Sequence, residues 1–184
     1  MLKVTLPDGS QREYTSTVSA GDIAADIGPG LAKAAIVAQA DDELVDLATP
    51  LPNEGHIALR IITKRDDDAL LVMRHSCAHV MAQAVMRLYR GVQLAFGPTT
   101  ATGFYYDFAL DEPLSEDDFG KIEAEMRKII KENLSFERME LPRAEAVDLC
   151  RELGQDFKVE HIETGLADQN QLSFYRQGEF VDLC

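Results

Sequence analysis

The sequence has no tryptophan, few aromatic residues and only three cysteines. Aromatic side chains make up 7% of its 184 residues. The cysteines Cys77, Cys150 and Cys184 are far apart and form no Cys-x-x-Cys pair, which excludes a zinc knuckle and a dithiol redox motif. An odd number of isolated cysteines is typical of reduced thiols, not of a disulfide framework.

Long hydrophobic runs and an N-terminal signal segment are also missing. Apolar runs such as Ala34–Ala38 are far shorter than the stretch of about 20 residues that spans a bilayer. The first six residues, Met1–Leu6, alternate like a strand and contain no apolar signal-peptide segment. We therefore expect a cytoplasmic protein with no membrane partner.

Positive charge is scarce. The chain carries 18 Lys and Arg against 32 Asp and Glu, for a net charge of -14. This deficit is shared by residues 1–62, with a net charge of -5, and residues 63–184, with -9. Nucleic-acid binding by bulk electrostatics requires clustered Lys and Arg, so any contact with RNA must be local or assisted.

Residues 1–62 have the pattern of short strands around one helix. The segment Pro7–Ser10 has turn chemistry and lies between two alternating runs, which predicts a β-hairpin. Ser19 and Asp22 have the spacing of a capping box, and the following helix should end at Gly28-Pro29-Gly30. These features predict a small β-grasp unit. Its expected strands are residues 3–6, 11–14, 35–40, 43–46 and 57–62.

The rest of the chain is richer in helical patterns. The charged segment 63–68 breaks the apolar pattern and is expected to be a linker. Apolar residues then recur at helical spacing in three segments, which predicts three helices that bury one stripe each. The aromatic stretch 92–108 should be a bent strand or hairpin. The helices are expected from residues 66–68 to Gly91, from Ser115 and Asp118 onward, and from Pro142 to Gly154.

Two histidines in the first of these helices are candidate functional residues. His75 and His79 are spaced i, i+4, so they project side by side and can hold a metal or a water. Ser76 stands where the His-Glu-x-x-His motif of zinc proteases has its general base, which disfavours that class. The spacing alone is equally consistent with a polar patch on a structural helix.

The order of these motifs resembles the N-terminal region of bacterial-type threonyl-tRNA synthetases over essentially the whole chain. Residues 6–10 and 26–32 are similar to the TGS domain of that family, which is a β-grasp unit. The segments that are similar to the second domain of the family, which edits mischarged tRNA, are Arg74–His79, Gly97-Pro98, Gly103–Asp107 and Val181–Cys184.

This resemblance implies an α+β architecture with two domains. Residues 1–62 would form a TGS-like β-grasp (ubiquitin-like) domain, and residues 63–68 a linker. Residues 69–184 would form an α+β editing domain with an antiparallel sheet and a His-x-x-x-His helix. Family sequences continue with Arg-Gly-Pro-His after the last cysteine, so we expect a domain truncated at its C-terminus, in a fragment without the aminoacylation and anticodon-binding domains.

The resemblance also implies the site and its substrate. The reaction would be hydrolysis of the aminoacyl ester of seryl-tRNA(Thr), and the partners would be the tRNA 3′ end and the other synthetase domains. No cofactor is expected; if zinc were bound, its ligands would be His75, His79 and Cys184. The implied catalytic residues are His75, His79, Lys158 and Cys184, and the implied substrate-binding residues are Tyr106, Asp182 and Gly97.

Two other functions fit the sequence. The chain could be a noncatalytic module that docks on tRNA or on the synthetase, or a small zinc hydrolase unrelated to translation. Other reactive side chains are expected to be structural. We expect Tyr105, Cys77 and Cys150 in the core, and His56 and His161 at the surface or in loops.

Overall fold

A computed structural model describes residues 1–184, and it confirms the α+β class. The chain divides into two compact units, Met1–Met73 and Arg74–Cys184. The long helix α3 (Asp67–Leu88) runs through this division, beginning inside the predicted linker. No helix combines the length and the apolar character that a membrane crossing requires.

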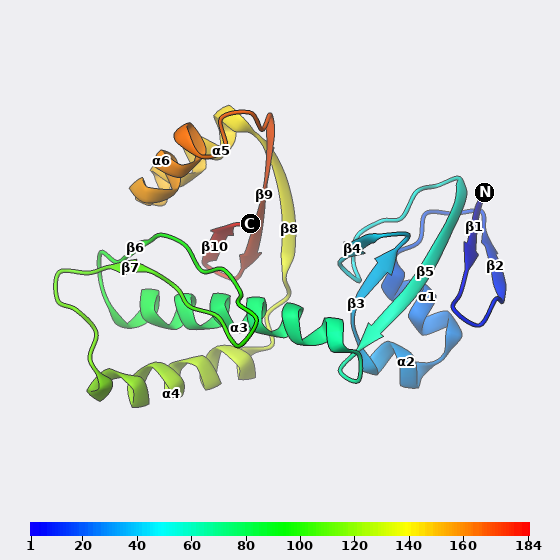
Figure 1. The fold of residues 1–184 in the computed structure, drawn as a ribbon, viewed down its shortest axis with the longest axis horizontal. Helices are drawn as coiled ribbons and strands as arrows, with labels where there is room; N and C mark the ends of the chain where they lie inside the picture. Colours follow the sequence, from blue (N-terminus) through cyan, green and yellow to red (C-terminus); the bar gives the residue numbers. More distant parts are fainter. The chain divides into compact units, whose positions relative to one another are not determined.

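The first unit is a five-stranded sheet with two helices (Figure 1). The strand order is β2-β1-β5-β3-β4, and only the pairing of β1 with β5 is parallel. The predicted hairpin is present, with Leu2 opposite Tyr14. The elements are β1 (Leu2–Thr5), β2 (Gln11–Tyr14), α1 (Ala20–Ile27), α2 (Pro29–Ala34), β3 (Ala35–Ala40), β4 (Glu43–Val45) and β5 (Gly55–Thr63).

Helix α1 packs on this sheet and begins as the sequence predicts. The side chain of Ser19 accepts from the backbone N–H of Asp22, and the Asp22 carboxylate accepts from the backbone N–H of Ser19. Ile23 of α1 is fully buried among side chains of β1 and β5. One expectation needs correction: the Gly28-Pro29-Gly30 segment ends α1, but it also starts α2, because proline suits the first position of a helix.

The second unit contains helices and two antiparallel sheets (Figure 1). One sheet has the order β10-β9-β8, and β6 pairs with β7 in a separate hairpin. Besides most of α3, the elements are β6 (Gln93–Leu94), β7 (Phe108–Ala109), α4 (Glu116–Glu132), β8 (Glu137–Pro142), α5 (Arg143–Glu152), α6 (Asp156–Thr164), β9 (Gln171–Gln177) and β10 (Phe180–Leu183).

Two hydrophobic cores share strand β10. Phe180 packs into a core formed mainly by α3 and α4, whereas Val181 packs into a core formed by α5, α6 and the sheet. The alternation of side chains along a strand gives β10 these two faces. The core stripe of α4 is narrower than predicted, because Phe119 and Ile130 are exposed. Helix α6 was not predicted.

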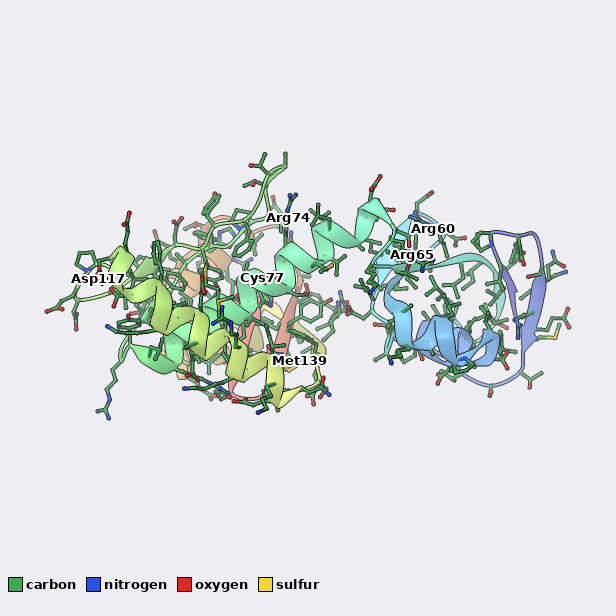
Figure 2. All side chains as sticks on the ribbon, turned by 90° about the horizontal axis from the view of Figure 1, so that it is seen from below. Arg60, Arg65, Arg74, Cys77, Asp117 and Met139 are labelled. Atoms are coloured by element: carbon green, nitrogen blue, oxygen red, sulfur yellow. The ribbon has the colours of Figure 1, made fainter.

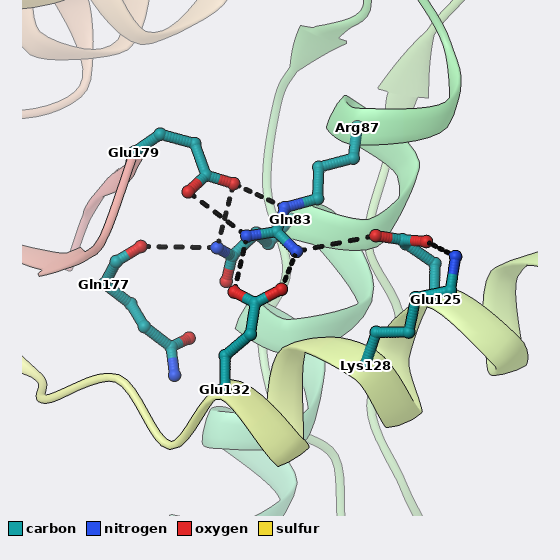
Figure 3. Close-up of polar contacts among 7 residues, drawn as sticks. All are labelled: Gln83, Arg87, Glu125, Lys128, Glu132, Gln177 and Glu179. Atoms are coloured by element: carbon teal, nitrogen blue, oxygen red, sulfur yellow. Dashed lines mark hydrogen bonds and ion pairs between the residues drawn. The ribbon is translucent and has the colours of Figure 1, made fainter.

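A polar stripe of α3 holds the turn between β9 and β10 (Figure 3). Gln83 is fully buried, and its amide donates to the carbonyl oxygen of Gln177 (3.3 Å) and to Glu179 Oε1 (3.1 Å). One turn later, Arg87 donates to Glu179 Oε1 (2.5 Å) and through two nitrogens to Glu132 of α4 (2.7 and 2.8 Å). Because both residues of α3 bind the same turn, β10 is fixed alongside α3.

Candidate functional site

Strand β10 brings its C-terminal end over the histidines of α3. His75 and His79 lie one helical turn apart, and their ring centroids are 4.4 Å apart. Asp182 lies two residues after Phe180, on the same face of β10, and Cys184 follows the strand with the same spacing. The polar stripe of α3 continues from Arg87 and Gln83 to these histidines, so the contacts that hold the β9–β10 turn also position the end of β10.

The thiol of Cys184 lies between the two imidazoles. Its Sγ is 3.5 Å from Nε2 of His75 and 3.3 Å from Nε2 of His79. One ligand atom from each of these three residues lies within 4.8 Å of the others, a spacing that could hold a metal ion. The three side chains differ in exposure, because His79 is buried, His75 is half-buried and Cys184 is exposed.

A buried polar network joins this cluster through Asp182. Oδ2 of Asp182 is 3.5 Å from Nε2 of His79 and accepts a 2.7 Å hydrogen bond from the hydroxyl of Tyr106. The other oxygen, Oδ1, accepts from the ammonium of Lys158, which also lies 3.3 Å from the Tyr106 hydroxyl. Only 3% of the Asp182 side chain and 5% of the Lys158 side chain are exposed, so the pair carries opposite charges out of water.

Burial shifts the pKa values of two of these groups. It lowers the pKa of His79 to about 4, against an opposing effect of the Asp182 carboxylate, and the nearby His75 and Lys158 lower it further. Burial also raises the pKa of the Tyr106 hydroxyl far above its usual range, and the adjacent Asp182 adds to this shift. At pH 7 His79 is therefore neutral and can accept a hydrogen bond, while Tyr106 remains a donor.

Gly97 supports the ring of Tyr106. A Cβ atom at Gly97 would lie 2.1 Å from Cδ2 of Tyr106, so only glycine leaves room for the ring in this position. Phe108 also stacks on Tyr106, with a centroid distance of 4.9 Å and an interplanar angle of 18°. The two neighbours fix the ring whose hydroxyl binds Asp182.

All seven residues named from the sequence therefore lie in one connected region of the second unit. Six of them contact one another through side-chain atoms, and Gly97 contacts Tyr106 through its backbone. Lys158 lies on α6, one turn after the end of α5. Sequence reasoning missed Gln83, Arg87 and Glu179, although the spacing of four from His79 through Gln83 to Arg87 is visible in the sequence.

The remaining candidates lie outside this network. Tyr105 is 51% exposed, which corrects its expected place in the core, and Cys77 is only half-buried. Cys150 is buried as predicted, and burial raises the pKa of its thiol to about 11. His56 is exposed, and His161 is half-buried on α6.

Arg74 connects the helix that carries the histidines to a neighbouring loop. Figure 2 labels Arg74 and Cys77 on α3, the helix that also carries His75. The guanidinium of Arg74 donates to the carbonyl oxygens of Thr100 (3.2 Å) and Ala101 (2.9 Å). These bonds tie the loop between β6 and β7 to α3.

Known proteins that are similar to this chain include one domain family and several tRNA ligases. Residues 2–63 match the TGS domain. The whole chain is 56% identical over 187 residues to a threonine–tRNA ligase of Rhodopirellula baltica, 25% of which it covers. It is 48% identical to a threonine–tRNA ligase of Nitrosococcus oceani and 46% identical to one of a Geobacillus species, and it covers 28% of each. The chain thus spans about a quarter of the length of these curated relatives.

Proposed function

This chain is related over its full length to the N-terminal quarter of threonine–tRNA ligases, and from that relationship we propose that its second unit hydrolyses mischarged seryl-tRNA(Thr). A water oxygen attacks the carbonyl carbon of the aminoacyl ester. The bond from that carbon to the 3′ oxygen of the terminal adenosine breaks, and a proton passes to the 3′ oxygen. The products are free serine and uncharged tRNA.

The observation that carries the proposal is the convergence of His75, His79, Lys158 and Cys184 in one site. Ester hydrolysis needs an oriented water, a proton acceptor and a positive group near the developing oxyanion. The neutral imidazole of His79 accepts from a water, and the half-buried His75 is the more accessible of the two rings. The ammonium of Lys158 supplies the positive charge, held in place by Asp182.

The substrate side of the site consists of Tyr106, Asp182 and Gly97. Asp182 is an acceptor that can attract the α-ammonium of an amino acid, and Tyr106 holds it in position through a 2.7 Å hydrogen bond. The exposed thiol of Cys184 lies beside the two histidines. Tyr106 and Asp182 would contact the adenosine or the amino group of the substrate, and Gly97 leaves room for the Tyr106 ring.

A separate hydrolytic site is useful because binding alone discriminates poorly between serine and threonine. Serine lacks one methyl group of threonine, and a missing methyl changes binding by only about 1–3 kcal/mol. A synthetic site alone therefore charges tRNA(Thr) with serine too often. A second pocket can reverse the preference, because the extra methyl of threonine collides with a wall that serine does not reach.

The proposed partners follow from the same relationship. They are the 3′ end of tRNA(Thr) and the catalytic and anticodon-binding domains of the parent synthetase. The TGS unit contributes no residue to the site described here, and we assign it a positioning role.

The test compares two nonhydrolysable substrate analogues by calorimetry. One carries serine and the other threonine, each joined through an amide to 3′-amino-3′-deoxyadenosine. We expect the serine compound to bind at least about tenfold more tightly, the factor that corresponds to one methyl-sized clash. Equal affinity for both compounds would show that the site does not select serine, and binding of neither would favour the noncatalytic docking function.

Deacylation of seryl-tRNA(Thr) by the chain gives a second readout. The double substitution His75→Ala and His79→Ala should abolish it, while His56→Ala, at an exposed histidine of the first unit, should leave it unchanged. Unaltered deacylation by the double variant would remove both histidines from the mechanism.

A zinc hydrolase is the second candidate function, and the donor set of His75, His79 and Cys184 favours it. The donor atoms of the three side chains lie 3.3 and 3.5 Å apart along the Cys184 contacts, which suits three corners of a zinc tetrahedron. Bound zinc would supply a Lewis acid and an activated water at this position. The editing reaction proposed here requires no cofactor.

Metal analysis separates the two functions. One tightly held zinc per chain, whose removal by a chelator abolishes ester hydrolysis, would support the zinc hydrolase. Serine-selective binding that persists in chelator-treated protein would support metal-free editing.

A further inference from the structure

An aromatic pair borders the site on the side of Tyr106 and Lys158. The ring of Phe96 meets the ring of His161 edge to face, with centroids 4.6 Å apart and an interplanar angle of 76°. Phe96 precedes Gly97, which contacts Tyr106, and His161 lies three residues after Lys158 on α6. Residues at this helical spacing share a face, so His161 lies on the face of α6 that carries Lys158, and Phe96 is the chain neighbour of the glycine that contacts Tyr106.

Both rings are held in place. A Cβ atom at Gly165 would lie 2.7 Å from Nδ1 of His161, so this glycine packs closely against the imidazole. The backbone around Phe96 is fixed by the hydrogen bond from the N–H of Asp107 to the carbonyl of Phe96 (2.7 Å). The backbone of Phe96 and the imidazole of His161 are thus each held by a neighbouring segment.

The two segments that carry the rings are also tied together. The backbone N–H of Leu94 donates to the side chain of Gln155 (2.7 Å), and Gln93 accepts from the N–H of Asp156 (2.9 Å). These bonds connect the β6–β7 hairpin to the start of α6. The Phe96–His161 contact is thus not needed to hold the hairpin to the helix.

Phe96 nevertheless leaves 43% of its surface in water beside a polar site. Exposed, ordered aromatic rings are the usual means of holding unpaired nucleic-acid bases, because every base offers a face on which to stack. Stacking does not need the clustered positive charge that this chain lacks. A rigid ring also loses little conformational entropy on binding.

We propose that Phe96, supported edge-on by His161, forms a stacking platform for an unpaired base at the 3′ end of the RNA. In the proposed substrate this is the adenine of the nucleotide that carries the ester. The inference rests on the proposed function, since that function places the 3′ end at the site. It adds the residues that recognise the nucleoside rather than the amino acid.

The experiment uses two probes that differ only in the base. One is the amide of serine with 3′-amino-3′-deoxyadenosine, and the other is the same seryl amide of the corresponding methyl riboside, which has no base. The wild-type chain should bind the adenosine probe more tightly. Phe96→Ala should weaken the adenosine probe about tenfold, since removing one stacking side chain typically has an effect of this size, and should leave the riboside probe unchanged.

Three further variants control the result. Phe96→Tyr keeps a ring and should retain wild-type affinity. Gly165→Ala displaces the His161 ring and should weaken the adenosine probe in the same way as Phe96→Ala. Phe119→Ala removes a phenylalanine that is 57% exposed on α4 and should change neither affinity.

Each alternative outcome has a defined meaning. If Phe96→Ala weakened both probes equally, the pair would be a structural support and the stacking role would be overturned. If it weakened neither, or if the wild-type chain bound both probes equally, the platform would also be overturned while the editing function stood. If the wild-type chain bound neither probe, the proposed function itself would fail, and the platform with it.

Discussion

His79 is the buried histidine of the site, and its environment keeps it neutral. Burial lowers its pKa to about 4, whereas a histidine in an unfolded chain has a pKa of about 6.5. The unfolded chain therefore binds a proton first as the pH falls below 6.5. The stability that comes from neutral His79 is complete above that pH and is lost progressively toward pH 4.

We predict that NMR signals of the His79 ring will not shift between pH 8 and about pH 5. The protein unfolded in urea provides the reference titration for the same ring. A midpoint at pH 6 or above in the folded protein would mean that the ring is hydrated or that the Asp182 carboxylate outweighs burial.

The buried pair of Lys158 and Asp182 predicts a large effect of a small substitution. Asp182→Asn removes the charge but little volume, and it leaves the ammonium of Lys158 buried without a counterion. Breaking such a pair costs about 3–5 kcal/mol, whereas an exposed pair contributes about 1 kcal/mol or less. Asp26→Asn, which removes the exposed partner of Arg12, is the matched control in urea unfolding. Similar losses for both variants would contradict the burial argument.

Substitution of Gly97 should have a steric effect that substitution of Gly103 does not have. A methyl group at Gly97 would overlap the Tyr106 ring, whereas one at Gly103 of the same loop meets no atom within 4 Å. We expect Gly97→Ala to displace Tyr106, to lower the melting temperature and to weaken the seryl-adenosine analogue at least about tenfold. Gly103→Ala should behave like the wild type in both measurements. Normal analogue binding by Gly97→Ala would show that the position of Tyr106 does not matter to the site.

At the scale of elements, the pairing of α3 with the β9–β10 turn predicts an acid-sensitive contact. Hydrogen bonds from Arg87 lower the pKa of Glu179 to about 2 from its ordinary value of 4.5. Because the folded-state pKa is depressed, the stabilisation is present above pH 4.5 and is lost as the pH falls toward 2. Glu179 is half-exposed, so solvent screening limits the contribution to about 1 kcal/mol.

Glu179→Gln should therefore destabilise the chain at pH 7 and flatten the decline in stability between pH 4.5 and 3. Urea unfolding at several pH values measures both effects. Glu140→Gln, which removes a half-exposed carboxylate paired with Arg138 on β8, is the control and should leave the acid profile nearly parallel to that of the wild type. An unchanged profile in Glu179→Gln would show that Arg87 does not hold this carboxylate in solution.

Local chemistry explains which elements could be predicted from the sequence. The Ser19–Asp22 and Ser115–Asp118 pairs predict helix starts, because each capping box satisfies backbone groups within four residues. Helices α2 and α6 were not predicted, because no such local signal marks where they begin. They are short, and each begins within a few residues of the end of the preceding helix, so nothing in periodicity separates them from loops.

Contacts between residues that are far apart in the sequence are also hard to predict, as the site shows. Helical spacing alone brings His75 and His79 together, but Cys184 lies more than 100 residues away along the chain. Its place above the histidines depends on the path of β10, which Gln83 and Arg87 fix through the β9–β10 turn. Only the resemblance to a known family could connect the cysteine with the histidines in advance, and it could not reveal the residues that position the strand.

For the whole molecule, net charge limits how RNA can bind. A protein that makes 6–10 phosphate contacts loses about 10³–10⁵ in affinity between 50 and 200 mM salt, because Lys and Arg release counterions. This chain has a net charge of -14, and residues 63–184, which include the site, carry -9. Their excess of negative charge repels a phosphate backbone, so the recognition proposed above would depend on contacts around the 3′ end.

We predict that the affinity of the chain for an acceptor-stem RNA with an amide-linked 3′ serine will change less than about threefold over this salt range. Screening of the overall repulsion offsets the loss of the few attractive contacts. The phosphate-free seryl-adenosine analogue, measured at the same salt concentrations, shows whether the site itself stays intact. A steep fall for the RNA alone would reveal several phosphate contacts on a local basic surface, and recognition would then extend well beyond the 3′ nucleotide.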